Sequence, residues 1–365
     1  MKNYFIIILI IVSFSCSRQK SVQTNIIHID IDSKSSQNLP ELSINSVIPL
    51  ETNESSLFGD IMTIEYFSDR IFILDAFNRR SLLAFTNEGH YLNRTKLGKG
   101  PEEMINPFAF CIDREKDNLL VWDQTLGEMF VYDLDLNILS RKRYNVTIQQ
   151  FAKVGDNNML VFAHYKQDFL YKLYSNQFDT VKGKFVKDSE YEGVHLLSKP
   201  INTGYRTLMI APLDYHIYQL TKSGVHSEYL IDFGRYNIRS RDILENNFKS
   251  VWSQVYAGQK VSSLYGIAES DNFILFQIFF KDKKVYYLHS LKTNKTYRIN
   301  DYFEKGMLPE CQVRGIVKND IFYATVDPAE MLLFQKKFNQ QLLFKTISPE
   351  DNYVIITFSI KESVE

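Results

Sequence analysis

The sequence predicts an all-β protein, a six-bladed β-propeller with an inserted helix near residues 239–257. Two observations lead to this fold class. The 365 residues include 27 Phe and 22 Tyr against only 15 Gly, and aromatic side chains favour the half-buried faces of strands. In addition, a unit of four strand-like runs recurs about every 40–50 residues, a repeat length typical of propeller blades.

The composition excludes several other classes of protein. With 45% hydrophobic and 23% charged residues, the chain is too apolar to be disordered. Its 42 Lys and Arg balance 43 Asp and Glu, so it lacks the basic excess that nucleic-acid binding requires, and we expect no nucleic-acid partner. Three Cys are too few for a disulfide scaffold; Cys111 and Cys311 are expected to be buried free thiols.

Residues 1–15 are predicted to be a lipoprotein signal peptide. Lys2 precedes an apolar run at residues 4–14, which is too short to span a bilayer. Small residues at Ser13 and Ser15 then lead to Cys16, a pattern that resembles a bacterial lipobox. In such signals the Cys thiol is acylated, and Cys16 would anchor the chain to a membrane through its lipid. The alternative is an ordinary secretory signal with an incidental Cys.

The predicted organisation therefore has three parts. After the signal peptide, residues 16–40 form the lipidated Cys and a flexible tether, within which residues 25–31 can form a strand. Residues 41–362 form the propeller, beginning with a candidate strand at residues 42–50.

The first two repeat units are the clearest. Each consists of three apolar strand-like runs followed by a more polar fourth run, with turns rich in Asp, Asn and Gly between them. The runs of the first unit are residues 61–67, 70–75, 81–86 and 90–97, and those of the second are residues 107–113, 119–123, 129–134 and 138–144.

Four further units follow, of which the fourth is weaker and the sixth is irregular in its third run. Their strand-like runs are residues 148–154, 159–165, 169–175 and 180–186; residues 207–211, 215–221 and 225–233; residues 263–268, 272–280, 284–291 and 296–300; and residues 312–317, 320–326 and 353–360.

A ring of blades is the physical consequence of such units. One four-stranded sheet cannot cover both of its faces, whereas blades packed around an axis bury each other's faces. We expect residues 42–50 to close the ring by joining residues 353–360 in one blade. Residues 239–257 carry apolar side chains at helical spacing, which predicts a helix between the fourth and fifth blades, and residues 329–337 are a second helical candidate.

With the repeat and the leader in place, the chain resembles the six-bladed β-propeller lipoproteins of Bacteroidetes, within the NHL-like propeller superfamily. The matching stretches are residues 49–52 (PLET), 72–75 (FILD), 98–103 (GKGPEE) and 351–352 (DN). The resemblance implies the fold but no activity, because that family is largely without an assigned one. The tether lacks the acidic run that resembles a surface-export signal, which favours the periplasmic face of the outer membrane.

Two groups of residues are candidate ligand or loop contacts. The first is the stretch Gly98, Lys99, Gly100, Pro101 and Glu102, continued by Glu103. It lacks the Gly-Lys-Ser/Thr ending of a phosphate-binding loop, so the alternative is a tight connection between blades in which a carboxylate caps backbone amides. The second is Asp75 and Asp123, which end equivalent strands; they either line the channel or cap their own turns.

No pattern of catalytic or metal-ligating residues stands out. The seven His are scattered, with His164 and His216 nearest to the expected channel. The aromatic-basic run at residues 281–287 (KDKKVYY) is interpreted as a strand with one solvated face. We expect no cofactor and no metal.

The leading hypothesis is a non-catalytic, lipid-anchored propeller of the cell envelope that binds a glycan, a peptide or an envelope protein at the ring mouth. The alternative is a metal-assisted envelope lyase or hydrolase that uses channel-facing Asp and His. A cluster of inward carboxylates and imidazoles would favour the enzyme, and a mouth lined by Tyr, Phe and Arg would favour binding.

Overall fold

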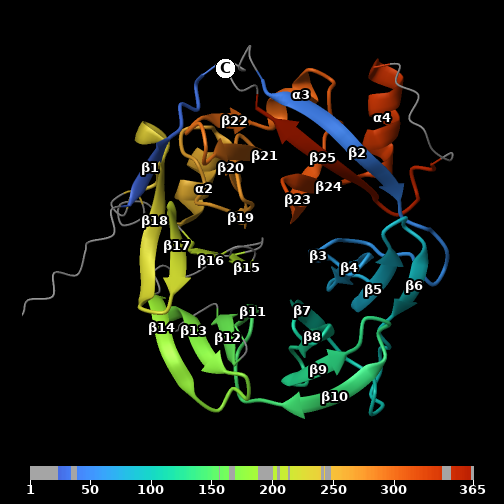
Figure 1. The fold of residues 1–365 in the computed structure, drawn as a ribbon. Helices are drawn as coiled ribbons and strands as arrows, with labels where there is room; N and C mark the ends of the chain where they lie inside the picture. The colour runs from blue at the N-terminus through green and yellow to red at the C-terminus, as the bar shows by residue number, and fades with distance from the viewer. Residues whose placement is uncertain are drawn as a thin grey trace, which may run out of the picture.

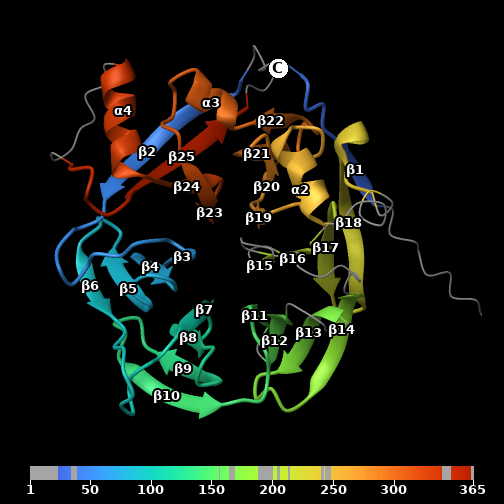
Figure 2. The same ribbon diagram turned by 180° about the vertical axis from the view of Figure 1, so that it is seen from behind.

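Six small sheets stand around a central axis in the computed structural model of the chain (Figure 1). The structure describes residues 24–362 apart from 34–38, 156, 164–168, 188–199, 204–205, 213, 240–241, 243–247 and 339–346. The same ring seen from behind carries helices α2, α3 and α4 near blades 5 and 6 (Figure 2). The predicted six-bladed propeller is thereby confirmed.

In blades 1 to 5 the chain passes from the innermost strand to the outermost strand in sequence order, whereas blade 6 takes its outermost strand from the N-terminal part of the chain. Blade 1 holds β3 (Thr63–Phe67), β4 (Arg70–Asp75), β5 (Ser81–Thr86) and β6 (Tyr91–Arg94). Blade 2 holds β7 (Pro107–Asp113), β8 (Asn118–Asp123), β9 (Glu128–Tyr132) and β10 (Ile138–Arg143), and blade 3 holds β11 (Gln150–Val154), β12 (Asn158–Phe162), β13 (Phe169–Ser175) and β14 (Val181–Lys187).

The remaining blades carry the additions to the repeat. Blade 4 holds β15 (Ile201–Thr203), β16 (Thr207–Ile210), β17 (His216–Thr221) and β18 (Gly224–Asp232), with β1 (Asn25–His28) added outside. Blade 5 holds β19 (Gly266–Glu269), β20 (Phe273–Phe280), β21 (Lys283–Ser290) and β22 (Thr296–Arg298), and blade 6 holds β23 (Gln312–Lys318), β24 (Ile321–Val326), β25 (Val354–Lys361) and β2 (Glu41–Pro49). The helices among the described residues are η1 (Gly234–Tyr236), α2 (Phe248–Tyr256), α3 (Asn300–Glu304) and α4 (Pro328–Phe338).

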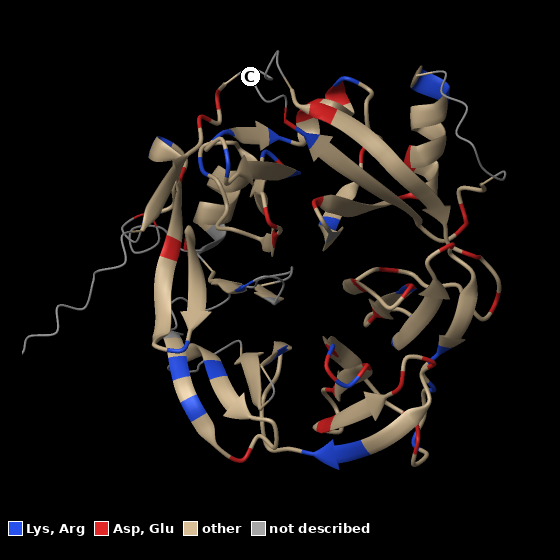
Figure 3. Ribbon diagram, viewed as in Figure 1, with Lys and Arg blue, Asp and Glu red and all other residues tan. Residues whose placement is uncertain are grey.

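The middle strands are apolar on both faces because a neighbouring blade covers each face. In β4, residues Ile71 and Ile73 pack toward blade 6, whereas Phe72 and Leu74 pack toward blade 2. All four side chains are fully buried. The outermost strand β10 is exposed along most of its length and carries a row of basic residues, as does β14 (Figure 3). The polar fourth runs of the sequence are therefore the strands that face solvent.

One strand from the N-terminal part of the chain closes the ring. β2 pairs antiparallel with β25, from Glu41 opposite Lys361 to Pro49 opposite Val354. The hydroxyls of Ser46 and Thr357 lie 2.6 Å apart across this pair. The predicted pairing of residues 42–50 with 353–360 is confirmed, and blade 6 joins the two ends of the propeller.

A second N-terminal strand binds to blade 4. β1 pairs in parallel with the outer edge of β18, and the side chain of Ile27 is buried against that blade. Part of the segment predicted as a flexible tether is thus held against the ring. The strand at residues 25–31 was foreseen, but its partner was not, because parallel pairing between residues 204 positions apart leaves no local signal in the sequence.

The helices match two predictions and add one element. α2 covers part of the predicted 239–257 helix, and its Val251 and Val255 pack with Ile238 and Phe279. α4 matches the second helical candidate. α3 was not predicted: the run at residues 296–300 was expected to be a strand throughout, but β22 ends at Arg298 and Asn300 begins a helix.

Removing the closing strand should unfold the ring. A chain that begins at Glu51 lacks β2 and leaves β25 with an unpaired edge and an open interface between blades 6 and 1. We expect it to lose cooperative thermal unfolding. A chain that begins at Leu39 lacks only β1 and should keep a cooperative transition at a lower midpoint. Calorimetry of both chains measures the difference, and a cooperative transition in the shorter chain would contradict closure by β2.

Candidate binding site at the ring mouth

Charged side chains on or next to the innermost strands form ion pairs between neighbouring blades. Lys153 of blade 3 lies 2.9 Å from the carboxylate of Asp113 in blade 2, and both side chains are buried. Arg114 of blade 2 lies 3.8 Å from Glu65 in blade 1. The first pair satisfies two buried charges between blades, and the second links a half-exposed arginine to the neighbouring blade, so both have a structural role.

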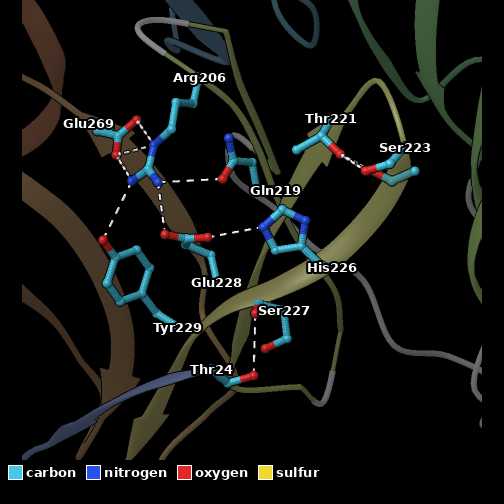
Figure 4. A network of polar contacts seen from close by, with 11 residues as sticks. Thr24, Arg206, Gln219, Thr221, Ser223, His226, Ser227, Glu228, Tyr229 and Glu269 are labelled. Atoms are coloured by element: carbon cyan, nitrogen blue, oxygen red, sulfur yellow. Dashed lines mark hydrogen bonds and ion pairs between the residues drawn. The ribbon is translucent and has the colours of Figure 1, made fainter. Parts of the chain in front are cut away.

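Arg206, Glu228 and Glu269 form a network of ion pairs that links blades 4 and 5 (Figure 4). The Arg206 Nε donates to both carboxylate oxygens of Glu269 at 2.9 and 3.1 Å, and Nη1 donates to Glu228 at 2.9 Å. Glu228 in turn contacts the His226 ring at 3.1 Å. The Glu269 carboxylate raises the pKa of Arg206, as expected of a guanidinium held by acceptors.

The inner strands of blades 1 to 4 enclose a cavity of about 50 Å³. This volume has room for only a few water molecules. Its lining includes Glu65, Arg114 and Lys153, whose charges are paired or engaged as described, and Cys111, whose thiol pKa is raised by burial. A cavity of this size does not admit an organic ligand.

A different arrangement lies where the innermost strands of blades 5, 6 and 1 begin. We call it the mouth cluster, and it comprises Lys284, Arg314, Tyr265, Gln312 and Asp60. Tyr265 directly precedes β19, Gln312 begins β23, and Asp60 lies in the connection that leads into β3. Since every blade runs in the same direction from its innermost strand, these starts lie at one end of the ring and surround its mouth.

The contacts of the two cations are with neutral groups. The Lys284 Nζ donates to the Gln312 side-chain oxygen at 3.1 Å and lies 5.8 Å from the centroid of the Tyr265 ring. The Arg314 Nε donates to the Thr325 hydroxyl at 2.9 Å, and Nη1 donates to the Ile61 carbonyl at 3.3 Å. Within the described residues neither cation forms an ion pair.

The pKa values reflect this lack of an anionic partner. Burial lowers the pKa of Lys284, and the neighbouring Arg314 lowers it further. Burial also lowers the pKa of Arg314, and the exposed Asp60 only partly compensates. Burial raises the pKa of Tyr265 to about 12. The charge of Arg314 acts against that of Lys284, and the exposed Asp60 is the carboxylate that acts on both of them. A bound anion beside them would stabilise both charges.

The connection at residues 50–62 is held in place by Asn352. Its side-chain nitrogen donates to the carbonyls of Glu51 and Ser56, and its oxygen accepts from the amide of Phe58 at 3.3 Å. The Phe58 ring stacks on Tyr353 at 6.0 Å. This rigid support places Ile61 and Asp60 beside Arg314, so the side of the mouth cluster formed by blade 1 is preformed.

Asp75 and Asp123 occupy equivalent positions, and both are fully buried. Asp75 accepts hydrogen bonds from the backbone amides of Gly59, Phe77, Asn78 and Arg79. Asp123 accepts from those of Ile105, Asn106, Thr125 and Leu126. A ligand at either carboxylate would have to displace four backbone donors, so the geometry matches the turn-capping alternative.

The stretch from Gly98 to Glu103 forms a tight connection between blades 1 and 2. The Glu103 carboxylate accepts from the Gly100 amide at 2.8 Å, and the Gly98 amide donates to the Met104 carbonyl at 3.0 Å. Gly98 has a φ of +154°, and a Cβ there would lie 1.9 Å from the Glu103 carboxylate. Lys99, Pro101 and Glu102 are exposed at the tip of this loop.

The remaining predicted residues are not gathered into a site. His216 is bonded to Asp214, with the His Nδ1 2.6 Å from the carboxylate, which raises the pKa of His216. His164 and Cys16 lie outside the described residues. The described part of the chain holds no group of three His, Cys, Asp or Glu side chains that could share a metal ion, and none of its helices is long and apolar enough to cross a membrane.

Comparison with known proteins identifies the family. The profile described as "Domain of unknown function (DUF4934)" matches residues 24–359. The chain belongs to the DUF4934 family. No curated protein matches its sequence.

Two solved structures share the fold of this DUF4934 chain. One is described as an exported protein of Bacteroides fragilis; it is 18% identical, with a TM-score of 0.76 over 93% of this chain and 100% of that chain. The other is a DUF4221 family member from Bacteroides vulgatus, 11% identical, with a TM-score of 0.56 over 90% of this chain and 100% of that chain. The expected resemblance to propellers of Bacteroidetes is confirmed for the fold.

The mouth cluster was missed in the DUF4934 sequence because its residues are dispersed. Lys284 stands in the run at residues 281–287, which was interpreted as a strand with a solvated face. That interpretation holds for Lys283, which is exposed, but Lys284 points to the opposite face and is half-buried. The available signal was a basic residue near the beginning of two strands that are apolar farther along, Lys284 before VYYL and Arg314 in QVRGIV.

Replacing Lys284 by Met should stabilise the ligand-free protein. The folded-state pKa of Lys284 lies below its ordinary value of 10.5, so the charged form costs stability at neutral pH, and this cost fades as the pH rises toward 10.5. We expect Lys284→Met to raise the thermal midpoint by roughly 1–3 °C at pH 7 and by less at pH 10.

Lys283→Met is the matched control, because it removes the neighbouring, exposed lysine. It should change the midpoint little at either pH. The thermal midpoints of the unaltered protein, Lys284→Met and Lys283→Met are measured at pH 7 and pH 10. A destabilised Lys284→Met protein at pH 7 would contradict an uncompensated charge at this position.

Proposed function

We propose that this chain is a non-catalytic binding module of the cell envelope that captures an anionic ligand at the mouth cluster. The observation that carries the proposal is the pair Lys284 and Arg314, two half-buried cations with only neutral hydrogen-bond partners. Arg206 provides the internal contrast, because its carboxylate partners raise its pKa, whereas Arg314 has a lowered pKa.

The chemistry of the cluster selects the ligand class. The guanidinium of Arg314 offers a planar set of donors that suits a carboxylate, sulfate or phosphate group, and Lys284 adds a point charge. Tyr265 beside Lys284 provides an aromatic ring on which a sugar or an apolar ligand portion can pack. An acidic sugar or an acidic peptide side chain fits these groups, in line with a glycan or peptide ligand.

Anion binding should be detectable as thermal stabilisation. Sodium salts of glucuronate, sulfate, phosphate and glutamate are compared with sodium chloride at equal ionic strength. A ligand at 100 times its dissociation constant adds about 2.7 kcal/mol to the free energy of unfolding, so one or more anions should raise the thermal midpoint.

The variants assign the effect to the mouth cluster. Lys284→Met should reduce the anion-dependent shift at least fivefold, and Arg314→Lys should weaken it by removing the two-pronged donor set. Lys283→Met should keep the shift of the unaltered protein. If no anion stabilises the protein, or if Lys284→Met responds equally, the proposed site is wrong.

The proposal also includes the membrane anchor. The apolar run at residues 4–14 and the small residues before Cys16 support acylation of Cys16 and attachment to the outer membrane, facing the periplasm. The exported relative of the same fold is consistent with an envelope location.

Mass spectrometry of the protein purified from bacterial membranes tests the anchor. We expect a chain that begins at Cys16 and carries a diacylglyceryl group with further acyl chains, and we expect Cys16→Ser to appear in the soluble fraction. A chain that begins after Cys16, or that carries no lipid, would leave an ordinary secretory signal as the explanation.

A further inference from the structure

The outermost strands of blades 2 and 3 carry a concentrated positive charge. β10 has the sequence ILSRKR and β14 has VKGKFVK, so neither strand contains an acidic residue. Five of their basic side chains are exposed, and both strands lie at the outer edge of the ring, where parts of their ribbons are coloured for Lys and Arg (Figure 3). We call these the basic rim: Arg141, Lys142, Arg143, Lys182 and Lys184.

Two lysines of the basic rim have neutral hydrogen-bond partners, while the charge of Lys142 also lowers the pKa of Asp179. Lys142 donates to the side-chain oxygen of Gln177 at 2.8 Å, and Lys182 donates to that of Asn158 at 2.6 Å. Both acceptors are neutral amides. Arg141 lies 3.7 Å from Glu128 but remains partly exposed. Because the whole chain has a formal charge of −1, the basic rim is a local concentration of positive charge on a nearly neutral molecule.

Exposed apolar residues accompany these charges. Leu139 in β10 has an exposed fraction of 54%, and Val181 in β14 has one of 45%. Basic side chains next to isolated apolar ones are the combination that binds the boundary between lipid headgroups and acyl chains.

The N-terminal segment reaches the ring on the neighbouring blade. The Thr24 hydroxyl bonds to the Ser227 carbonyl near the start of β18, and the hairpin between β17 and β18 lies beside β14 in both ribbon views (Figures 1 and 2). From Cys16 to Thr24 the chain spans at most about 30 Å. An acylated Cys16 would therefore hold this side of the ring close to the membrane.

We propose that the basic rim rests on anionic lipid headgroups, so that the propeller stands with blades 2 and 3 against the membrane. The closeness of the anchor rests on the proposed acylation of Cys16, whereas the charge and the apolar side chains belong to the described strands. In this orientation the ring axis lies roughly parallel to the membrane, and the mouth cluster opens sideways to the periplasm.

Vesicle binding of a chain without lipid tests the surface by itself. A chain that begins at Ser17 keeps every described residue and cannot be acylated at Cys16. It should sediment with vesicles of phosphatidylcholine mixed with phosphatidylglycerol, and much less with phosphatidylcholine alone. Added salt should release it, since headgroup attraction is screened by ions.

Matched variants distinguish the basic rim from general charge. Neutralising Arg143, Lys182 and Lys184 to Gln should weaken binding to the anionic vesicles at least tenfold, because each basic group near such a surface strengthens binding about fivefold. Neutralising the exposed Lys292, Lys336 and Lys337 of blades 5 and 6 changes the net charge equally and should have little effect. Circular dichroism confirms that both variants are folded.

Three outcomes would overturn the inference. They are equal binding to neutral and anionic vesicles, equal losses in the two variants, and absence of vesicle binding combined with rim-dependent binding of polyglutamate. The last would assign the basic rim to an acidic protein partner. None of these results depends on an acyl anchor, because the tested chain lacks Cys16. A failure of Cys16 acylation and a failure of the basic rim can therefore be told apart.

Discussion

Mutual burial of blade faces is the constraint on which the rest of the molecule depends. The middle strands are apolar on both sides, and each side contributes to a different hydrophobic cluster: in β4, alternate residues pack toward blade 6 and toward blade 2. Such a strand is stable only when a blade stands on either side. The ring must therefore close, and the β2–β25 pairing in blade 6 closes it.

Closure also fixes where polar groups can lie. Charged side chains that the neighbouring blades remove from water need a partner. Lys153 with Asp113 and Arg206 with Glu269 meet this requirement with opposite charges across blade boundaries. Lys284 and Arg314 have only neutral partners within the described residues. Other charges between blades are paired, whereas Lys284 and Arg314 have no ion-pair partner among the described residues. A ligand could supply an anion at this place.

Much of the architecture was predictable from local patterns. Residues 70–75 and 119–123 could be predicted as buried strands, because short apolar runs bounded by turn residues are typical of strands covered on both faces. Asp75 and Asp123 were recognisable as equivalent because the repeat aligns them. In contrast, β15 was overlooked because it has only three residues, and the parallel pairing of β1 with β18 depends on contacts between distant parts of the chain.

The sequence by itself determined the fold class, the number of blades and the strand that closes the ring, since these follow from periodicity, turn residues and the need to cover apolar faces. Only the tertiary structure decided which charges meet. Alternation along a strand tells which face a side chain occupies, but not which blade covers that face. Asp60, Tyr265, Lys284 and Arg314 are brought together by the ring, and the electrostatic state of each depends on neighbours that the sequence places far away.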